Sequence, residues 1–433
     1  MTAERSSFDR EVERSYRFNF VVNAFDGALF WAGSSFIAST TILPVYVSRL
    51  TDSKFAIGLL SMIGSMGWLV PQLFTANWVQ RLPRKKVLPV NLGLLTERLP
   101  VVLLALSTLL VPVSPTWALL AFYLFFSWHV VGAGVVAVAW QAMIGKIIPA
   151  DRRGRFFGLT NFLGTATGLA GASGAAWMLD RYGFPGGYQR SFAVAAVMIA
   201  LSWIALALTR EPAQESTEPR ISQWEYLRRL PAVLREDPNF RRFLISRIVI
   251  ALGGMAGGFV TVYAVQRWSL SDGQAGGYTA SMLLGQSVAN LVLGALADRK
   301  GHKLVLELSA LAGVLGIGWA AVAPGPGWFH LVFVLTGVWT AGALLSGLMI
   351  ALEFCGEDLR PTYIGLNNTV RGLAFGVAPM IGGWLAATVG YRALFCVAFC
   401  VGLVGLSLLR WSVREPRGAS TGQTLSVPVE AHD

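Results

Sequence analysis

The sequence predicts an all-α integral membrane protein whose twelve transmembrane helices form two six-helix bundles. The 433 residues are 54% hydrophobic and only 14% charged, whereas a soluble chain has about 25% charged residues. Apolar runs long enough to cross a bilayer, about 20 residues each, recur throughout the chain. Charged turns between these runs also recur in the two halves, which indicates an internal repeat.

The apolar runs place the predicted helices in order along the chain. They cover residues 17–45, 55–78, 87–111, 116–145, 155–178, 190–209, 241–266, 275–297, 303–323, 328–352, 362–386 and 390–411. The resulting divisions are a cytoplasmic N-terminal segment (1–16), an N-terminal bundle (17–209), a cytoplasmic linker (210–240), a C-terminal bundle (241–411) and a cytoplasmic tail (412–433). The tail is rich in Gly, Ser, Thr and Pro, which predicts disorder.

The basic residues predict which side of the membrane each loop faces. If the N-terminus is cytoplasmic, the inside segments carry 26 Lys and Arg residues and the outside loops carry 6. This bias places both termini in the cytoplasm, and we expect the plasma membrane of a bacterium as the location. The net charge of +11 therefore reflects orientation and contact with anionic lipid headgroups, and we expect no nucleic-acid partner.

Two charged turns occur twice in the sequence. The segment from Gly294 to Leu306 (GALADRKGHKLVL) has an altered copy 218 positions earlier, from Ala76 to Leu88 (ANWVQRLPRKKVL). A second turn begins at Asp151 and is repeated 207 positions later from Asp358. The repeats superpose predicted helices 2–5 on helices 8–11, so the halves share one topology.

The first of these turns resembles the loop signature of the major facilitator superfamily of secondary transporters. The second copy matches the signature at five positions, namely Gly294, Asp298, Arg299, Gly301 and Lys303. The first copy departs from it at Ala76, Gln80 and Pro83. The resemblance implies that helices 1, 4, 7 and 10 line a central cavity and that helices 2, 5, 8 and 11 form the seam between the halves. It also implies a gating contact of Asp298 with the start of helix 5, near Asp151 and Arg153.

Several charged residues lie deep inside predicted spans, where each costs about 2.5–3.5 kcal/mol on insertion scales. Asp26 is the only acid well inside a helix expected to line the cavity, so it is our candidate for proton coupling. The alternative is a permanent pair with Arg98 or Arg371. Glu97 and Arg98 are neighbours and should point about 100° apart on a helix, so we expect a structural role without mutual neutralisation. Arg247 should reach back to the headgroups.

Aromatic and polar residues of the predicted cavity form the candidate substrate site. Aromatic side chains beside a few polar groups suit a small amphipathic molecule, although lipid-facing aromatic residues give the same pattern. The candidates are Asn23, Phe30, His129, Trp140, Tyr263, Gln286, Asn290, Trp339, Asn367, Asn368 and Arg371. The last three form a polar stripe in helix 11, which could bind a substrate anion or serve a structural or gating role.

These features favour a monomeric secondary transporter that exports a small amphipathic molecule by alternating access, driven by protons. One alternative is proton-coupled uptake of a sugar or an organic anion. Another is a receptor or scaffold of transporter fold that no longer transports. The sequence has no metal-ligand spacing, no phosphate-binding glycine loop and no nucleophile–base spacing, so we expect no cofactor, no metal and no enzymatic activity.

Overall fold

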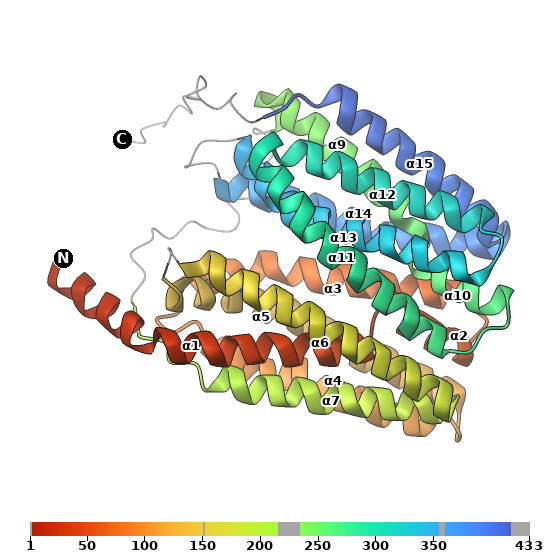
Figure 1. The fold of residues 1–433 in the computed structure, drawn as a ribbon, viewed down its shortest axis with the longest axis horizontal. Coiled ribbons are helices and arrows are strands. Elements are labelled where there is room, and N and C mark those ends of the chain that lie inside the picture. The colour runs from red at the N-terminus through yellow and green to blue at the C-terminus, as the bar shows by residue number, and fades with distance from the viewer. Residues whose placement is uncertain (1, 150–151, 215–233, 355–359, 417–433) are drawn as a thin grey trace, which may run out of the picture.

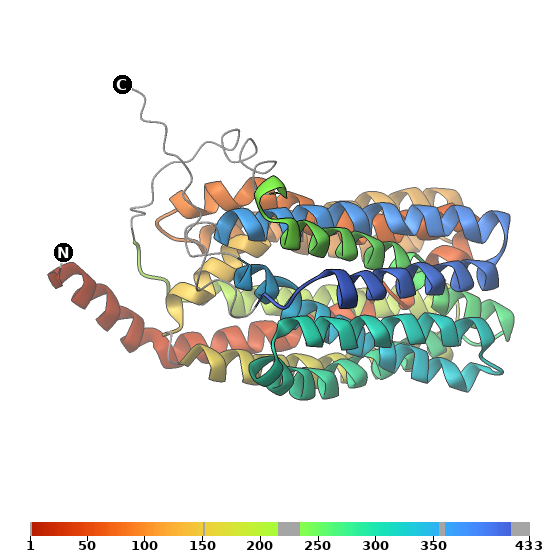
Figure 2. The same ribbon diagram turned by 90° about the horizontal axis from the view of Figure 1, so that it is seen from above.

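The computed structural model describes residues 2–149, 152–214, 234–354 and 360–416. All regular secondary structure in these residues is helical, and the helices lie lengthwise side by side (Figures 1 and 2). Ten of the helical segments are long and apolar enough to cross a membrane. The prediction of an all-α membrane protein is therefore confirmed. The two remaining predicted spans correspond to α1, which begins with many charged residues, and α6, which is rich in glycine and threonine.

The N-terminal half contains the segments that run from α1 to α7. They are α1 (Thr2–Phe36), α2 (Ile42–Leu50), α3 (Lys54–Arg81), η1 (Leu88–Leu92), η2 (Leu94–Arg98), α4 (Leu99–Ser107), η3 (Thr108–Leu110), α5 (Pro115–Ile147), α6 (Arg153–Tyr182) and α7 (Gly186–Ala207). The C-terminal half contains α9 (Pro238–Gly253), η5 (Gly254–Ala256), α10 (Gly257–Arg267), α11 (Gly273–Lys300), α12 (His302–Val322), η6 (Pro326–Trp328), α13 (Phe329–Glu353), α14 (Arg360–Thr388) and α15 (Tyr391–Ser412).

The first span differs from its prediction at both ends. Its helix begins at Thr2 and projects beyond the other helices (Figure 1), because the charged residues of the segment are good helix formers. It then breaks between α1 and α2. Pro44 has no N–H to bond the carbonyl of Thr40, and that carbonyl instead accepts a hydrogen bond from Thr261 of the other half.

The two halves meet along two pairs of helices. In the first pair, α3 packs on α14, where Gly372 lies against Leu69 and Gly376 lies against Met66. In the second, α6 packs on α11, where Gly276 faces Ala176. Because glycine has no side chain, the helix backbones approach closely at these points. These are the seam helices that the resemblance implies.

The halves are held together at the end of the bundle remote from the start of α1 and the end of α15. There the Arg49 guanidinium lies 2.6 Å from the Asp272 carboxylate, and Thr41 hydrogen-bonds to Thr279. The Lys54 ammonium also donates to the carbonyl of Ala386 at 2.8 Å. Toward the opposite end the halves diverge (Figure 1). We call the end with these contacts the closed end.

In both halves, an asparagine near the start of the first helix bonds to the backbone just after the last helix. In the N-terminal half, the Asn19 side chain donates to the carbonyl of Arg210 and accepts from its amide, both at 2.8 Å. In the C-terminal half, Asn239 makes the same pair of bonds with Arg414, at 3.2 and 2.9 Å. We call this arrangement the asparagine tie. It joins the first and last helices of each half.

Candidate functional site

The first candidate site is a buried group of polar side chains inside the N-terminal half. We call it the N-terminal cluster, and it consists of Asp26, Glu97, Arg98, His129 and Ser202. The Asp26 side chain is only 4% exposed and accepts a hydrogen bond of 2.6 Å from the Ser202 hydroxyl. Arg98 and Trp140 also act on this carboxylate, Arg98 through its positive charge and Trp140 through a hydrogen bond. Of the two predicted cations for Asp26, Arg98 is therefore the neighbour.

Glu97 and Arg98 form an ion pair with each other, which corrects the expectation that they cannot neutralise one another. The backbone of η1 and η2 is π-helical rather than α-helical. A π-helix has more residues per turn, so neighbouring side chains point less far apart, and the arginine can fold back onto the glutamate. Short π-helical segments often occur at functional sites.

His129 joins the cluster through the backbone of η2. Its Nδ1 lies 2.8 Å from the carbonyl oxygen of Glu97. A carbonyl only accepts, so Nδ1 carries the hydrogen in this contact. A side chain in place of Gly132, one turn further along α5, would collide with the backbone carbonyl of Thr96. Glycine therefore lets α5 approach the π-helical segment closely enough for the histidine to bond.

The charges of the N-terminal cluster do not balance when all its acids are ionised. Two carboxylates, Asp26 and Glu97, share the single guanidinium of Arg98, so the net charge is −1 with neutral histidine. Both acids and the arginine are at most 6% exposed. Since an uncompensated charge in a buried site is costly, the cluster can be neutralised by the uptake of one proton.

The second buried group lies in the C-terminal half. We call it the C-terminal cluster, and it consists of Arg247, Gly347, Asn367 and Arg371. Arg247 is 4% exposed, so the expectation that it reaches the headgroups is wrong, because its side chain points into the bundle. The Asn367 amide donates to the carbonyl of Gly347 at 2.9 Å. The two arginines are close enough for their like charges to repel each other.

Three of the predicted cavity residues make contacts within their own half, and their role in a cavity stays a prediction. Asn23 donates to the carbonyl of Asn19 and to the hydroxyl of Thr209. Tyr263 accepts a hydrogen bond from Arg392 and lies among aromatic rings at the closed end. Trp339 packs against Gly313 of α12. These side chains are held by contacts that the apolar pattern does not reveal. Four further candidates are partly buried, namely Phe30, Gln286, Asn290 and Asn368.

A third polar group was not predicted and lies where the loop after α3 meets the end of α7. The Glu211 carboxylate accepts hydrogen bonds from the backbone amides of Lys85 and Lys86, at 2.8 and 2.7 Å. It also lies 3.0 Å from the Lys146 ammonium. Burial and the nearby charge of Lys146 lower the pKa of Lys85 from its ordinary value, while Glu211 acts to raise it.

A sequence signal for Glu211 does exist. The tripeptide Arg210-Glu211-Pro212 recurs 204 positions later as Arg414-Glu415-Pro416, directly after the last helix. In the second half, Glu415 lies beside Gly301 in the loop after α11. Gly301 has a φ of +90°, which favours glycine. Each half therefore places a glutamate from its C-terminal end against the corresponding loop.

The structure describes some of the other residues of the loop signature and not others. Lys303 donates to the carbonyl of Arg410 and pairs with Glu307, while Arg299 is exposed and Gly294 has open space beside it. The side chains of Asp298 and Arg153 lie outside the described part of the structure, and so does the whole of Asp151. Their gating contact stays a prediction.

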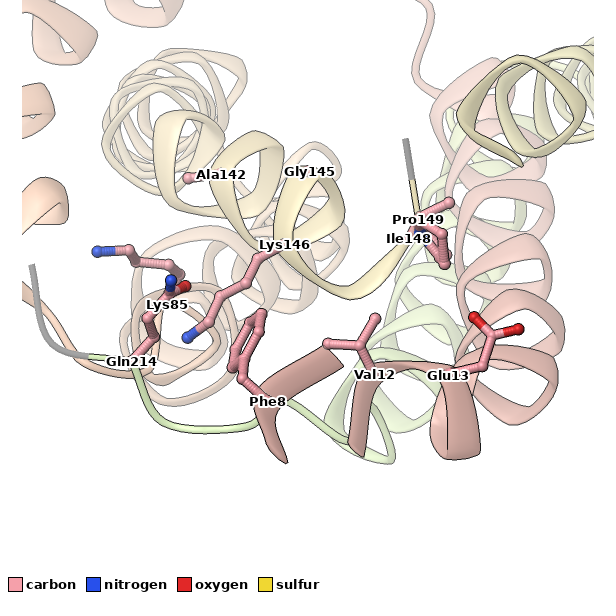
Figure 3. Close-up of a pocket in the computed structure, with 10 residues that line it drawn as sticks. All are labelled: Phe8, Val12, Glu13, Lys85, Ala142, Gly145, Lys146, Ile148, Pro149 and Gln214. Carbon is pink, nitrogen blue, oxygen red and sulfur yellow. The ribbon is translucent and has the colours of Figure 1, made fainter. Parts of the chain in front are cut away.

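A cavity of about 650 Å³ opens beside the third polar group, at the end that carries the start of α1 (Figure 3). Phe8, Val12 and Glu13 from α1 lie on one side of it, and Lys146 from α5 lies on another. None of the residues of the two buried clusters lines this cavity. This cavity is therefore separate from both buried clusters.

The sequence matches the family model of the Major Facilitator Superfamily over residues 32–267 and 243–428. These matches cover most of the chain, and the protein therefore belongs to this superfamily of transporters. Its helical halves, seam and loop signature agree with that membership.

Individual curated relatives match only part of the chain and at low identity. The chain is 30% identical over 156 residues to an efflux pump of Hypomyces subiculosus, a match that covers 36% of this chain and 27% of the relative. It is 28% identical over 157 residues to a 4-hydroxybenzoate transporter of Acinetobacter baylyi, covering 35% and 34%. The chain thus matches only about a third of the length of these curated relatives.

The fold also matches solved transporters over nearly their whole length. A crystal structure of a D-xylose–proton symporter superposes with a TM-score of 0.67 and covers 94% of this chain and 100% of the symporter, at 17% identity. This likeness supports the arrangement of the helices.

Proposed function

We propose that the protein is a proton-coupled secondary transporter that moves a small amphipathic molecule by alternating access. The observation that carries this proposal is the net charge of −1 in the buried N-terminal cluster. A buried site that lacks one positive charge gains from binding a proton. If access to the cluster changes as the halves rock, the proton can be taken up on one side and released on the other.

Asp26 is the residue that we propose to carry the proton. Its hydrogen bond from Ser202 and the nearby charge of Arg98 favour the ionised form, whereas its burial favours the neutral form. Opposing influences of this kind let a modest change of surroundings alter the protonation state. Glu97 is less suited, because it already pairs directly with Arg98.

Flux measurements in proteoliposomes with Asp26→Asn test the proposal. We expect the variant to exchange substrate across the membrane but to lose accumulation driven by a pH difference. Asp52→Asn, which changes an exposed carboxylate in the loop before α3, serves as the matched control and should accumulate substrate normally. A stable Asp26→Asn protein that still concentrates substrate against its gradient would remove Asp26 from this role.

The direction of transport has two candidates. Export of an amphipathic compound fits the apolar composition and the match to an efflux pump. Uptake of an organic anion is favoured by the two adjacent arginines of the C-terminal cluster, Arg247 buried and Arg371 partly buried, and by the match to a 4-hydroxybenzoate transporter. Substrate loaded inside or outside inverted vesicles, each with an imposed pH gradient, separates the two. Absence of any flux would favour a receptor or scaffold.

We also propose that the closed end of the bundle faces outward, so that the structure represents an inward-open state. The positive-inside bias supports this orientation. Cysteine substitutions at Arg84 and Val113, both exposed, test it in a background without the three native cysteines. An impermeant reagent should label position 113 in intact cells and leave position 84 unmodified. The reverse result would contradict the orientation.

A further inference from the structure

The C-terminal cluster holds two positive charges that the protein itself does not neutralise. Among the residues that the structure describes, no carboxylate forms an ion pair with Arg247 or Arg371. Nη2 of Arg247 and Nε of Arg371 are both buried without a hydrogen-bond acceptor. Buried donors are almost always satisfied in proteins, so two such donors on adjacent guanidinium groups indicate a missing acceptor.

We propose that Arg247 and Arg371 bind the carboxylate of an organic anion and that this anion is the transported molecule. The inference rests on the transport function proposed above and adds the chemical class of the substrate. Arginine suits this role because its planar group can donate two parallel hydrogen bonds to a carboxylate.

The geometry around Gly347 allows one ligand group to contact both arginines. A methyl group built on Gly347 would lie 3.3 Å from Nη2 of Arg247 and 3.6 Å from Nη1 of Arg371. The two guanidinium groups, from α9 and α14, therefore converge on one point beside α13. The Asn367 amide is fixed there by its bond to the carbonyl of Gly347.

The surroundings of the pair favour an anion with an apolar body. The ring of Phe375 lies 5.5 Å from the Arg371 guanidinium. Ile250, Ile350 and Leu366, each within one or two helical turns of the cluster, belong to a continuous apolar core. An organic carboxylate can place its charge on the arginines and its remaining atoms against apolar groups, which a small inorganic anion cannot do.

The fold itself does not require these arginines. The tie asparagines Asn19 and Asn239 are 220 positions apart, and the same offset matches Arg247 with Gly27. The offset of 207 between the second pair of charged turns matches Arg371 with Gly164. The N-terminal half builds the same bundle with glycine at both positions. The two cations are therefore a feature of one half, as expected for a ligand site rather than for a packing element.

Ligand-induced thermal shifts of the purified full-length protein test the proposal. The probes are benzoate and octanoate, their neutral amides benzamide and octanamide, and chloride as an inorganic anion. We expect at least one carboxylate to raise the melting temperature, while the amides and chloride do not. If neither carboxylate stabilises the protein more than its amide, the proposal is wrong.

Three variants test whether the carboxylate binds at the arginine pair. Arg247→Gln and Arg371→Gln should each weaken carboxylate binding by about tenfold or more, since hydrogen bonds to charged groups are worth about 1.5–3 kcal/mol. Without ligand, each should melt no lower than the native protein, because it removes an uncompensated buried charge. A purely structural arginine would instead lower the melting temperature when replaced.

Gly347→Ala retains both charges and fills the point on which they converge, so it should also weaken binding. Arg267→Gln, which changes an exposed arginine at the end of α10, is the control and should bind as the native protein does. Native carboxylate affinity in both arginine variants would overturn the assignment.

Flux of the same probes separates this inference from the proposed function. If carboxylates bind through the arginines but no solute crosses the membrane of proteoliposomes, the site stands and the transport function fails. If solutes are transported while the arginine variants bind and move carboxylates normally, the transport function stands and the anion site fails.

Discussion

The Glu211 carboxylate, at the end of α7, lies 3.0 Å from the ammonium of Lys146, at the end of α5. The same carboxylate accepts two backbone hydrogen bonds from the loop that follows α3. One side chain, fully buried, thus connects three helices of the N-terminal half. It does so at the end where the two halves diverge.

We expect Glu211→Gln to lower the free energy of unfolding by about 3 kcal/mol, because Lys146 then stays buried without its counter-charge. A neutral amide also accepts hydrogen bonds from the loop more weakly than a carboxylate does. Thermal unfolding and limited proteolysis of the loop at residues 82–87 measure both effects. Glu13→Gln, which alters a half-exposed ion pair with Arg152, is the control. An unchanged melting temperature for Glu211→Gln would show that the carboxylate is not needed to hold the loop.

The two asparagine ties should differ in strength. Asn19 is completely buried, and Asn19→Ala leaves two backbone groups of Arg210 without partners, at a cost of about 1–3 kcal/mol. The bonds of Asn239 are exposed, so water can replace them and Asn239→Ala should cost about 0.5 kcal/mol or less. Melting temperatures of the two variants test this order. Equal losses would mean that burial does not set the strength of the tie.

The ion pair between Arg49 and Asp272 should favour closure of the bundle at the end that we propose faces outward. Asp272→Asn removes the attraction between the halves there, and we expect a larger outward-open fraction. The double exchange Arg49→Asp with Asp272→Arg should restore closure. Reactivity of an introduced cysteine at Thr40, beside the contact of the halves, reports the change. The control is Arg392→Gln, whose side chain bonds only within its own half. Equal reactivity in all these proteins would exclude a gating role for the pair.

The loop signature predicts a second, opposite latch. A carboxylate at the start of a helix is favoured by the helix dipole and its free N–H groups, by about 1 kcal/mol. We therefore expect Asp298→Asn to slow transport and to increase the inward-open population. Gln80→Ala should have little effect, because the neutral glutamine offers no such charge. Accessibility of cysteines at the two ends, compared at matched expression, measures the shift. Similar effects of both substitutions would contradict an asymmetric latch.

Most of the fold could be predicted because apolar length decides which segments cross a membrane. Apart from the first, the predicted spans agree with the helix bounds to within a few residues, for instance 241–266 against Pro238–Arg267. The break before Ile42 was missed, since the residues on both sides of it are apolar. The π-helical turns of η1 and η2 were missed as well, because an apolar run does not distinguish a π-helix from an α-helix.

The candidate site was predicted less completely. Depth along a helix indicated that Asp26 and Arg98 would be buried, and both are. Depth alone also suggested that Arg247 would reach the lipid headgroups, but the direction of a side chain depends on the helices around it. Glu211 lies just beyond an apolar run, so a search for charges inside spans could not find it. Comparison of the residues that follow α7 and α15, which share the tripeptide Arg-Glu-Pro, would have revealed it.

The asparagine ties have a consequence for the way the protein is put together. Because each half joins its own first and last helices, the beginning and the end of that half lie next to each other, as they do in many proteins that tolerate circular permutation. We therefore expect that neither half needs the covalent link to the other to complete its bundle. The chain can thus be regarded as two self-contained subunits in one polypeptide. The chain can be divided between residues 214 and 234 and the two fragments produced together in one cell. We expect the fragments to associate in the bilayer along their glycine-lined seams.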